Sequence, residues 1–183
     1  MNPVESLDEA IHLAIGKWCK EDIPLLPGAE EADIRRIEKA YSITLPWDLR
    51  AYFQVTMGMD CSEFWPMDKD MLTFWRLPSV EDVETKKETP GYIAPLPQVV
   101  ADATGSPSDL VIGDWSILAF WFFAAISSDH GAPTQIYYGD GEQAYCVGET
   151  FEDFLRAYVA RGLDAFWSPD TTSGTTKAEQ KAS

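Results

Sequence analysis

Basic residues are scarce in this sequence. Its 183 residues contain 14 lysines and arginines against 30 aspartates and glutamates, which gives a net charge of −16 at pH 7. A surface with this excess of carboxylates repels both the phosphates of nucleic acids and the anionic headgroups of membranes. We therefore expect neither a nucleic acid nor a membrane as the partner of this chain.

Cysteine is also rare, and its spacing excludes two common roles. The three cysteines, Cys19, Cys61 and Cys146, are an odd number and lie far apart, with no C-x-x-C pair among them. This spacing argues against a disulfide framework and against a zinc ribbon. The N-terminal segment carries acids where a signal peptide would be basic, and no apolar stretch follows it. We expect reduced thiols and a cytoplasmic protein.

Groups suited to catalysis are few. The only two histidines are far apart in the sequence, and Asp129 beside His130 is the one candidate acid–base pair. Adjacent loop residues usually point apart, so we interpret this pair as a solvated turn. Cys146 lies in an expected strand, where a buried and inert thiol is the usual case. The sequence therefore predicts no catalytic residue and no cofactor.

A metal site is not indicated either. Carboxylates from separate parts of the chain could assemble around a cation, but they lack the close D-x-D-x-D spacing of a calcium loop. These carboxylates are Asp114, Asp140, Glu142 and Glu149. We expect no metal, and a small enzyme or a metal-dependent binder that uses these carboxylates is the third of three functional hypotheses.

No apolar run of membrane-spanning length stands out. The run from Ile117 to Ile126 has ten apolar residues, about half of the roughly 20 that a membrane-spanning helix needs. An unbroken apolar run of this length is typical of a strand that is covered on both faces, although a buried helix is the alternative. Nearby glycine and proline residues and the aromatic content favour the strand. We predict that Ile117 to Ala125 lies inside the sheet.

Helices and further strands are predicted around this central segment. The helices are expected to begin at Ser6, in an S-x-x-E capping pattern, to cover residues 29–41 and 46–58, and to run from Thr150 to Gly162. The strands are expected at residues 72–77, 110–112, 134–138 and 143–147, with a turn or bulge at residues 113–114 and a hairpin between the last two strands.

These elements predict an α+β fold in which helices pack with an antiparallel or mixed sheet of about five or six strands. Residues 1–167 are expected to form a single domain. Residues 168–183 contain no apolar side chain larger than alanine, so we expect a disordered tail. Residues 91–107 contain several prolines, and we expect a long surface loop whose role stays open.

The segment from Pro27 to Gly58 resembles the opening of the SUKH superfamily, the Smi/Knr-like proteins. The pattern consists of a glycine, an acid-rich helix, a tyrosine, Leu-Pro, a basic residue, an aromatic residue and a final glycine. The matching positions are Gly28, Glu31, Ile34, Ile37, Glu38, Tyr41, Leu45, Pro46, Arg50, Tyr52 and Gly58. Met57 departs from the pattern, because the family usually has asparagine before the last glycine. The resemblance implies a SUKH-like fold in which these positions are mostly structural.

The distribution of charge points to a binding surface. From Glu88 through Leu155 there are ten acids and no lysine or arginine. A solvated acidic surface needs no partner, but such a surface also attracts basic proteins. Interfaces combine steering charges with aromatic anchors. We therefore predict partner-binding residues at Asp114, Trp115, Tyr137, Tyr138, Asp140 and Glu142.

The resemblance to SUKH proteins suggests which kind of partner this surface binds. Many bacterial SUKH proteins are immunity proteins that neutralise a toxin by binding it, and the resemblance implies a binding module without catalytic residues. The leading hypothesis is a cytoplasmic immunity protein whose partner is a basic toxin domain. The second hypothesis is a regulatory scaffold of the Smi/Knr type that binds an endogenous protein.

Overall fold

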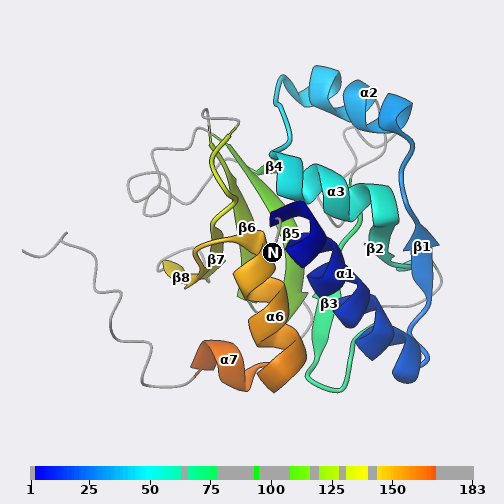
Figure 1. Ribbon diagram of the computed structural model, residues 1–183, viewed down its shortest axis with the longest axis vertical. Helices are drawn as coiled ribbons and strands as arrows, with labels where there is room; N and C mark the ends of the chain where they lie inside the picture. The colour runs from blue at the N-terminus through cyan, green and yellow to red at the C-terminus, as the bar shows by residue number, and fades with distance from the viewer. Residues whose placement is uncertain are drawn as a thin grey trace, which may run out of the picture.

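The computed structural model describes residues 3–62, 66–77, 93–94, 108–115, 120–127, 131–139 and 144–167. The expected tail at residues 168–183 lies outside the described residues, as does most of the expected loop at 91–107. The described elements form an α+β fold of helices and antiparallel strands, as the sequence predicts. The order along the chain is shown in Figure 1.

The described helices lie at the two ends of the chain. They are α1 (Pro3–Lys20), α2 (Glu31–Tyr41), α3 (Trp47–Val55), α6 (Phe151–Arg161) and α7 (Asp164–Trp167). In α1 the side chains of Leu7, Ile11, Ala14 and Trp18 are buried, and their spacing places them on one face of the helix. In α6 the Thr150 hydroxyl accepts a hydrogen bond from the Asp153 N–H, so the predicted cap is confirmed.

The main sheet is antiparallel and follows the order β3-β5-β6-β7-β8, with β4 also paired to β5. Its strands are β3 (Leu72–Phe74), β4 (Ile93–Ala94), β5 (Ser108–Trp115), β6 (Phe120–Ile126), β7 (Ile136–Gly139) and β8 (Ala144–Gly148). The predicted central strand is therefore confirmed from Phe120 onward, since β6 has neighbours on both sides. Residues 116–119 lie outside the described part.

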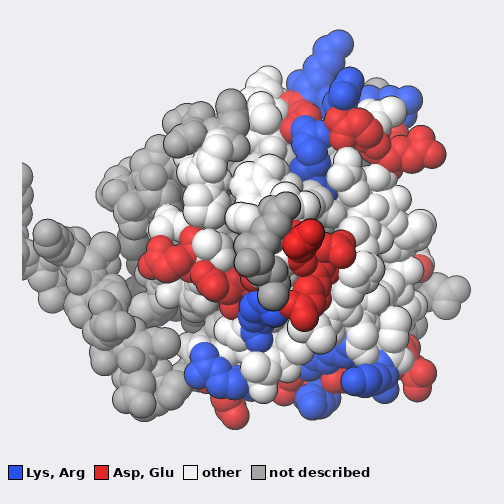
Figure 2. Space-filling view, in the orientation of Figure 1, with Lys and Arg blue, Asp and Glu red and all other residues white. Residues whose placement is uncertain are grey.

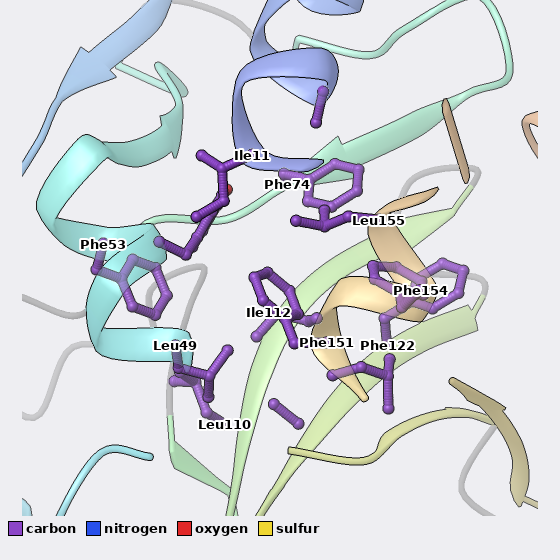
Figure 3. Packing of buried hydrophobic residues seen from close by; sticks show 14 of the residues in the cluster. Ile11, Leu49, Phe53, Phe74, Leu110, Ile112, Phe122, Phe151, Phe154 and Leu155 are labelled. Atoms are coloured by element: carbon purple, nitrogen blue, oxygen red, sulfur yellow. The ribbon is translucent and has the colours of Figure 1, made fainter. Parts of the chain in front are cut away.

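Side chains of β6 alternate between two apolar cores. Phe122, Ala124 and Ile126 pack with the helices in the larger core, whereas Phe123 and Ala125 belong to a smaller core with Trp75, Val111 and Tyr137. Figure 1 shows α1, α3 and α6 on one side of the sheet, and Figure 3 shows residues of these helices meeting Ile112 and Phe122. Both faces of β6 are thus covered, because neighbouring residues of a strand point to opposite sides.

A second, two-stranded sheet joins the chain before α2 to the chain after α3. It pairs β1 (Leu25–Pro27) with β2 (Thr56–Met59) in antiparallel fashion. The prediction that a helix continues to Gly58 is wrong, because α3 ends at Val55 and Gly58 lies in β2 with φ of 94°. A Cβ at Gly58 would lie 2.8 Å from the Phe74 carbonyl oxygen, so both the backbone conformation and the close approach of β3 require glycine.

Two further predictions on element ends are corrected. The helix expected to begin at Ser6 begins at Pro3, and the Ser6 hydroxyl donates to the Glu152 carboxylate of α6 instead of capping α1. Gly113 and Asp114 do not end β5, which continues to Trp115 with a register shift between Val111 and Gly113. The expected bulge is therefore present, and the expected turn is not.

Candidate interaction surface

Asp114 does not lie on the surface. It is 0% exposed, and its carboxylate accepts a hydrogen bond of 2.7 Å from the Trp75 indole N–H. Its strand, β5, lies between β3 and β6, where Asp114 pairs with Thr73 and Trp121. The prediction that Asp114 contacts a partner is wrong in this respect, because a carboxylate on a covered inner strand cannot reach a binding surface.

The predicted aromatic anchors are buried or half-buried, and they lie on opposite sides of the sheet. Tyr138 is 9% exposed and faces the helix-covered core, where the half-buried Trp115 also packs. Tyr137 is 7% exposed and belongs to the smaller core on the other side. The structure therefore does not bring these aromatic residues together on one exposed face. Asp140 and Glu142 lie outside the described residues.

A group of exposed carboxylates lies at the N-terminal ends of α1 and α6. These two helices run in the same direction, since Ser6 contacts Glu152 and Trp18 contacts Tyr158 farther along both helices. Figure 2 shows acidic side chains over this end of the molecule. The exposed or half-exposed acids here are Glu5, Asp8, Glu9, Glu149, Glu152 and Asp153. We call this group the acidic end; sequence reasoning missed its α1 members because they lie far from the acidic half of the chain.

Part of the acidic end has an internal role. Arg156 donates hydrogen bonds of 2.8 Å to Glu152, to Glu9 and to the Ser6 carbonyl oxygen. Burial opposes the ionisation of Glu152, but hydrogen bonds from Ser6 and Arg156 outweigh it and lower the pKa of Glu152. Acids in the first turn also stabilise the positive N-terminal end of each helix. Glu149 and Asp153 are exposed, and the Glu149 carboxylate accepts a hydrogen bond of 2.8 Å from the Gln135 side-chain amide.

A buried polar cluster closes the opposite end of the α1–α6 pair. The Asp68 side chain, fully buried, accepts hydrogen bonds from Lys17 Nζ at 2.8 Å and from the Tyr158 hydroxyl. Lys17 also bonds Asp70 at 2.8 Å and lies 3.8 Å from the centre of the Tyr158 ring. Trp18 donates to the Tyr158 hydroxyl at 2.7 Å. We call these five residues the α1–α6 junction.

The chemistry of the junction favours a structural role. The other Asp68 oxygen accepts the N–H groups of Asp70 and Leu72, so both carboxylate oxygens are used within the domain. Burial, followed by the charge of Asp68, raises the pKa of Tyr158 far above its usual range. A tyrosine that stays protonated and donates to a carboxylate joins elements together; it does not transfer protons near neutral pH.

The positions that carry the SUKH resemblance hold α2 against α3. Arg50 bonds both oxygens of Glu31 at 2.8 Å and also bonds Glu38, which accepts the Leu45 N–H. The Arg35 side chain, and after it Arg50, lowers the pKa of Glu31. A Cβ at Gly28 would lie 1.9 Å from the Gln54 carbonyl oxygen, so the chain before α2 touches the end of α3 closely.

The remaining motif positions have contacts within the domain as well. Ile34, Ile37 and Leu45 are buried in the larger core, and the half-buried Tyr41 packs against it. Pro46 is buried and precedes the first residue of α3. All of these contacts are internal, and a mostly structural role for these positions stays a prediction.

Strand β8 exposes side chains that sequence reasoning did not select. Tyr145 is 56% exposed, and Cys146 is exposed too, so the expectation of a buried Cys146 is wrong. Partial desolvation of the sulfur atom, followed by the charge of Glu149, raises the pKa of Cys146. The sequence around Tyr145 and Cys146 predicts a hairpin strand but not whether that strand lies at the edge of the sheet. Only the order of the strands in space determines which strand is at the edge.

The described residues offer little chemistry. Within them, no group of three or more His, Cys, Asp or Glu side chains could hold a metal ion. His12 is exposed, with its Nε2 3.6 Å from an Asp8 oxygen, and His130 lies outside the described part. In the same described part, no helix has the length and apolar character to cross a bilayer.

The α2–α3 contacts, the helix layer and the antiparallel sheet define an α+β domain of the SUKH kind. A model of the SMI1 / KNR4 family (SUKH-1) matches residues 28–157, well over half of the chain. The chain therefore belongs to this family, and the resemblance read from the motif is confirmed. Comparison with curated proteins finds no significant match.

Proposed function

We propose that this chain is a non-catalytic immunity protein that neutralises a basic toxin domain by binding it directly. The observation that carries the proposal is the excess of acids, with a net charge of −16 and no lysine or arginine from Glu88 through Leu155. Family membership supports the proposal, because the SUKH resemblance implies protein binding. A cytoplasmic location follows from it, since the producing cell needs protection there.

The placement of the carboxylates supports binding over catalysis. The buried carboxylates of Asp48 and Asp68 are bonded within the domain, Asp48 to the N–H and hydroxyl of Thr134. The carboxylates of the acidic end have two potentially reactive neighbours among the described residues, His12 beside Asp8 and Cys146 beside Glu149. Glu149 raises the pKa of Cys146, so this contact disfavours the reactive thiolate. An acidic surface accelerates the approach of a cationic protein and can cover a positively charged active site.

The proposal predicts that the reading frame next to this one encodes a toxin domain, and the test uses that domain. Co-expression with the intact chain should restore growth, and the two purified proteins should bind with an association rate that falls steeply as salt is added. Absence of both binding and protection would refute the proposal. Binding to an endogenous protein without any protection would instead favour a regulatory scaffold of the Smi/Knr type.

Two matched variants locate the face that the partner approaches. The variant Glu149→Gln with Asp153→Asn removes two exposed charges from the acidic end, and Glu30→Gln with Asp33→Asn removes two from the region of α2. We expect only the first variant to slow association, by about three- to tenfold at low salt. Equal slowing by both variants would show that net charge alone, and not the acidic end, steers the partner.

A further inference from the structure

We propose that β8 is a strand-addition site, to which an extended basic segment of the protein partner pairs as a new strand of the sheet. This inference rests on the proposed function, and it names the surface and the chemistry of the partner. Tyr137 and Tyr138 of β7, which the sequence suggested as partner contacts, are buried. The proposed contact surface is therefore β8, the strand paired with β7 in the same hairpin.

Strand β8 lies at the end of the strand order in the main sheet. Among the described strands, β8 is last in the order and pairs with β7 alone. All four residues of β7 are buried, whereas Tyr145 and Cys146 of β8 are exposed. The edge of a sheet presents backbone N–H and C=O groups that can pair with another extended chain, and this pairing is a common mode of peptide recognition.

Strand β8 has no charged residue and no proline in its sequence. Soluble proteins usually protect an edge strand with lysine, other charged side chains or proline. The sequence of β8, Ala-Tyr-Cys-Val-Gly, has none of these. Among the described residues, its protection is limited to its short length and a register shift near Val147, and Ala144, Tyr145 and Cys146 keep a regular register with β7. An edge that lacks charged protection is suited to pairing.

Acidic residues flank β8 in the sequence, and they favour a basic partner segment. Glu149 directly follows β8, and Asp153 follows in the first turn of α6, both exposed. In the sequence, Asp140 and Glu142 precede the strand. A second copy of this chain would bring the same acids against these, so self-pairing is opposed by repulsion. A segment with lysine or arginine is attracted, and the exposed Tyr145 ring offers such a cation an additional contact.

The probe for this inference is a capped decapeptide of alternating lysine and valine, which is basic and favours extended structure. On the intact chain it should shift the backbone NMR signals of residues 144–148 and slow their amide hydrogen exchange. A peptide with glutamate in place of every lysine serves as the charge control and should not bind. Absence of binding by the basic peptide, equal binding of both peptides, or signal changes confined to other elements would overturn the inference.

A pair of variants tests the edge without disturbing the fold. Tyr145→Lys introduces the charge that edge strands normally carry, at a side chain that is 56% exposed, and it should weaken the basic peptide about tenfold or more. Leu13→Lys makes the same change in charge on α1, at a side chain that is 45% exposed, and should have a much smaller effect. Equal weakening by the two variants, or a concentration-dependent dimer formed through β8, would overturn the inference.

Two exposed cysteines separate this inference from the proposed function. In the complex with the neighbouring toxin domain, alkylation of Cys146 should be slowed at least about tenfold, and alkylation of Cys19 on α1 should be unchanged. If the toxin is bound and neutralised while Cys146 reacts as in the free protein, the proposed function stands and strand addition is wrong. If the basic peptide pairs with β8 but no toxin is neutralised, the proposed function is wrong and the edge site stands.

Discussion

The α1–α6 junction and the β8 edge use polar and aromatic groups in opposite ways. At the junction, a lysine, two carboxylates, a tyrosine and a tryptophan bond one another between elements that are far apart in sequence. At the edge, Tyr145 and Cys146 face outward from a strand paired on one side by β7. Substitutions at the junction should therefore change stability, and substitutions at the edge should change binding.

Lys17 and Asp68 of the junction are largely buried, so the loss of one of them should be costly. A buried ion pair seldom adds net stability over an apolar contact, but removing one partner leaves the other charge buried and unpaired. Asp68 fixes Lys17 of α1 and Tyr158 of α6 at one point. At the β8 edge, a substitution does not leave a buried charge without its partner. The exposed side chains there stay in contact with water when a neighbouring residue is substituted.

The largest expected effect is that of Asp68→Ala. It leaves Lys17 without its buried carboxylate and the Tyr158 hydroxyl without its acceptor, and it should lower the free energy of unfolding by about 3–5 kcal/mol. Urea denaturation at pH 7 measures the loss. Asp70→Ala is the control, because its side chain is 25% exposed and Lys17 keeps Asp68. A loss no larger than that of the control would contradict the structural role of the junction.

Thr150→Ala has an intermediate effect at the point where β8 connects to α6. The substitution removes the hydroxyl that accepts the Asp153 N–H, and losing such a cap costs about 1 kcal/mol. Urea denaturation again reports the change, with Thr44→Ala at an exposed position as the control. If the two variants are equally stable, the cap does not stabilise α6.

Glu152→Gln tests the ion pair between Glu152 and Arg156 at the acidic end, and its effect should depend on pH. The pKa of Glu152 is lowered in the folded protein, so its ionised form contributes stability that is present above its ordinary value of 4.5 and is lost as the pH falls through the folded value. The variant should be less stable than the parent at pH 7, by at most about 1 kcal/mol, and the difference should shrink toward pH 3. Unfolding curves at both pH values measure it.

The control for this variant is Glu5→Gln, which removes one negative charge from the same end of the molecule at an exposed position. Its effect reports the general change in charge repulsion and is subtracted from that of Glu152→Gln. A loss of stability by Glu152→Gln that is the same at both pH values would show that the ion pair with Arg156 is not its cause.

Local signals in the sequence predicted those elements whose ends are determined locally. Helix α6 is an example: Thr150 caps it and Gly162 ends it at φ of 58°, both as expected. The β7–β8 hairpin and the apolar strand β6 were also predicted from local patterns in the sequence. At the motif, Glu38 and Arg50 were recognised as a pattern, and the structure shows the contact between helices that the pattern makes.

Contacts between distant segments were beyond the reach of sequence reasoning. The S-x-x-E pattern at Ser6 looked like a helix start, yet its hydroxyl is used by Glu152 across 146 positions of the chain. Strands β1 and β2 were missed because Pro27 and Gly58 suggest breaks, and only their pairing makes them strands. Gly113 suggested a turn or bulge at which Asp114 would be exposed. A Cβ at Gly113 would lie 2.5 Å from the Thr73 carbonyl oxygen, so this glycine instead allows β3 to approach β5 closely.

The smallest expected effect on stability is that of Tyr145→Ala. Its comparison with Tyr138→Ala tests directly whether β8 is an exposed edge or part of the core. Tyr145 and Tyr138 are direct cross-strand partners in the hairpin, but they are 56% and 9% exposed. Tyr145→Ala should change the free energy of unfolding by no more than about 0.5 kcal/mol, because little of its side chain is removed from water. Tyr138→Ala, the matched control, should lose about 3 kcal/mol, since it vacates space beside Phe120 and Phe122. Equal losses in urea denaturation would mean that β8 is part of the core, and the distinction between a structural interior and a binding edge would then be wrong.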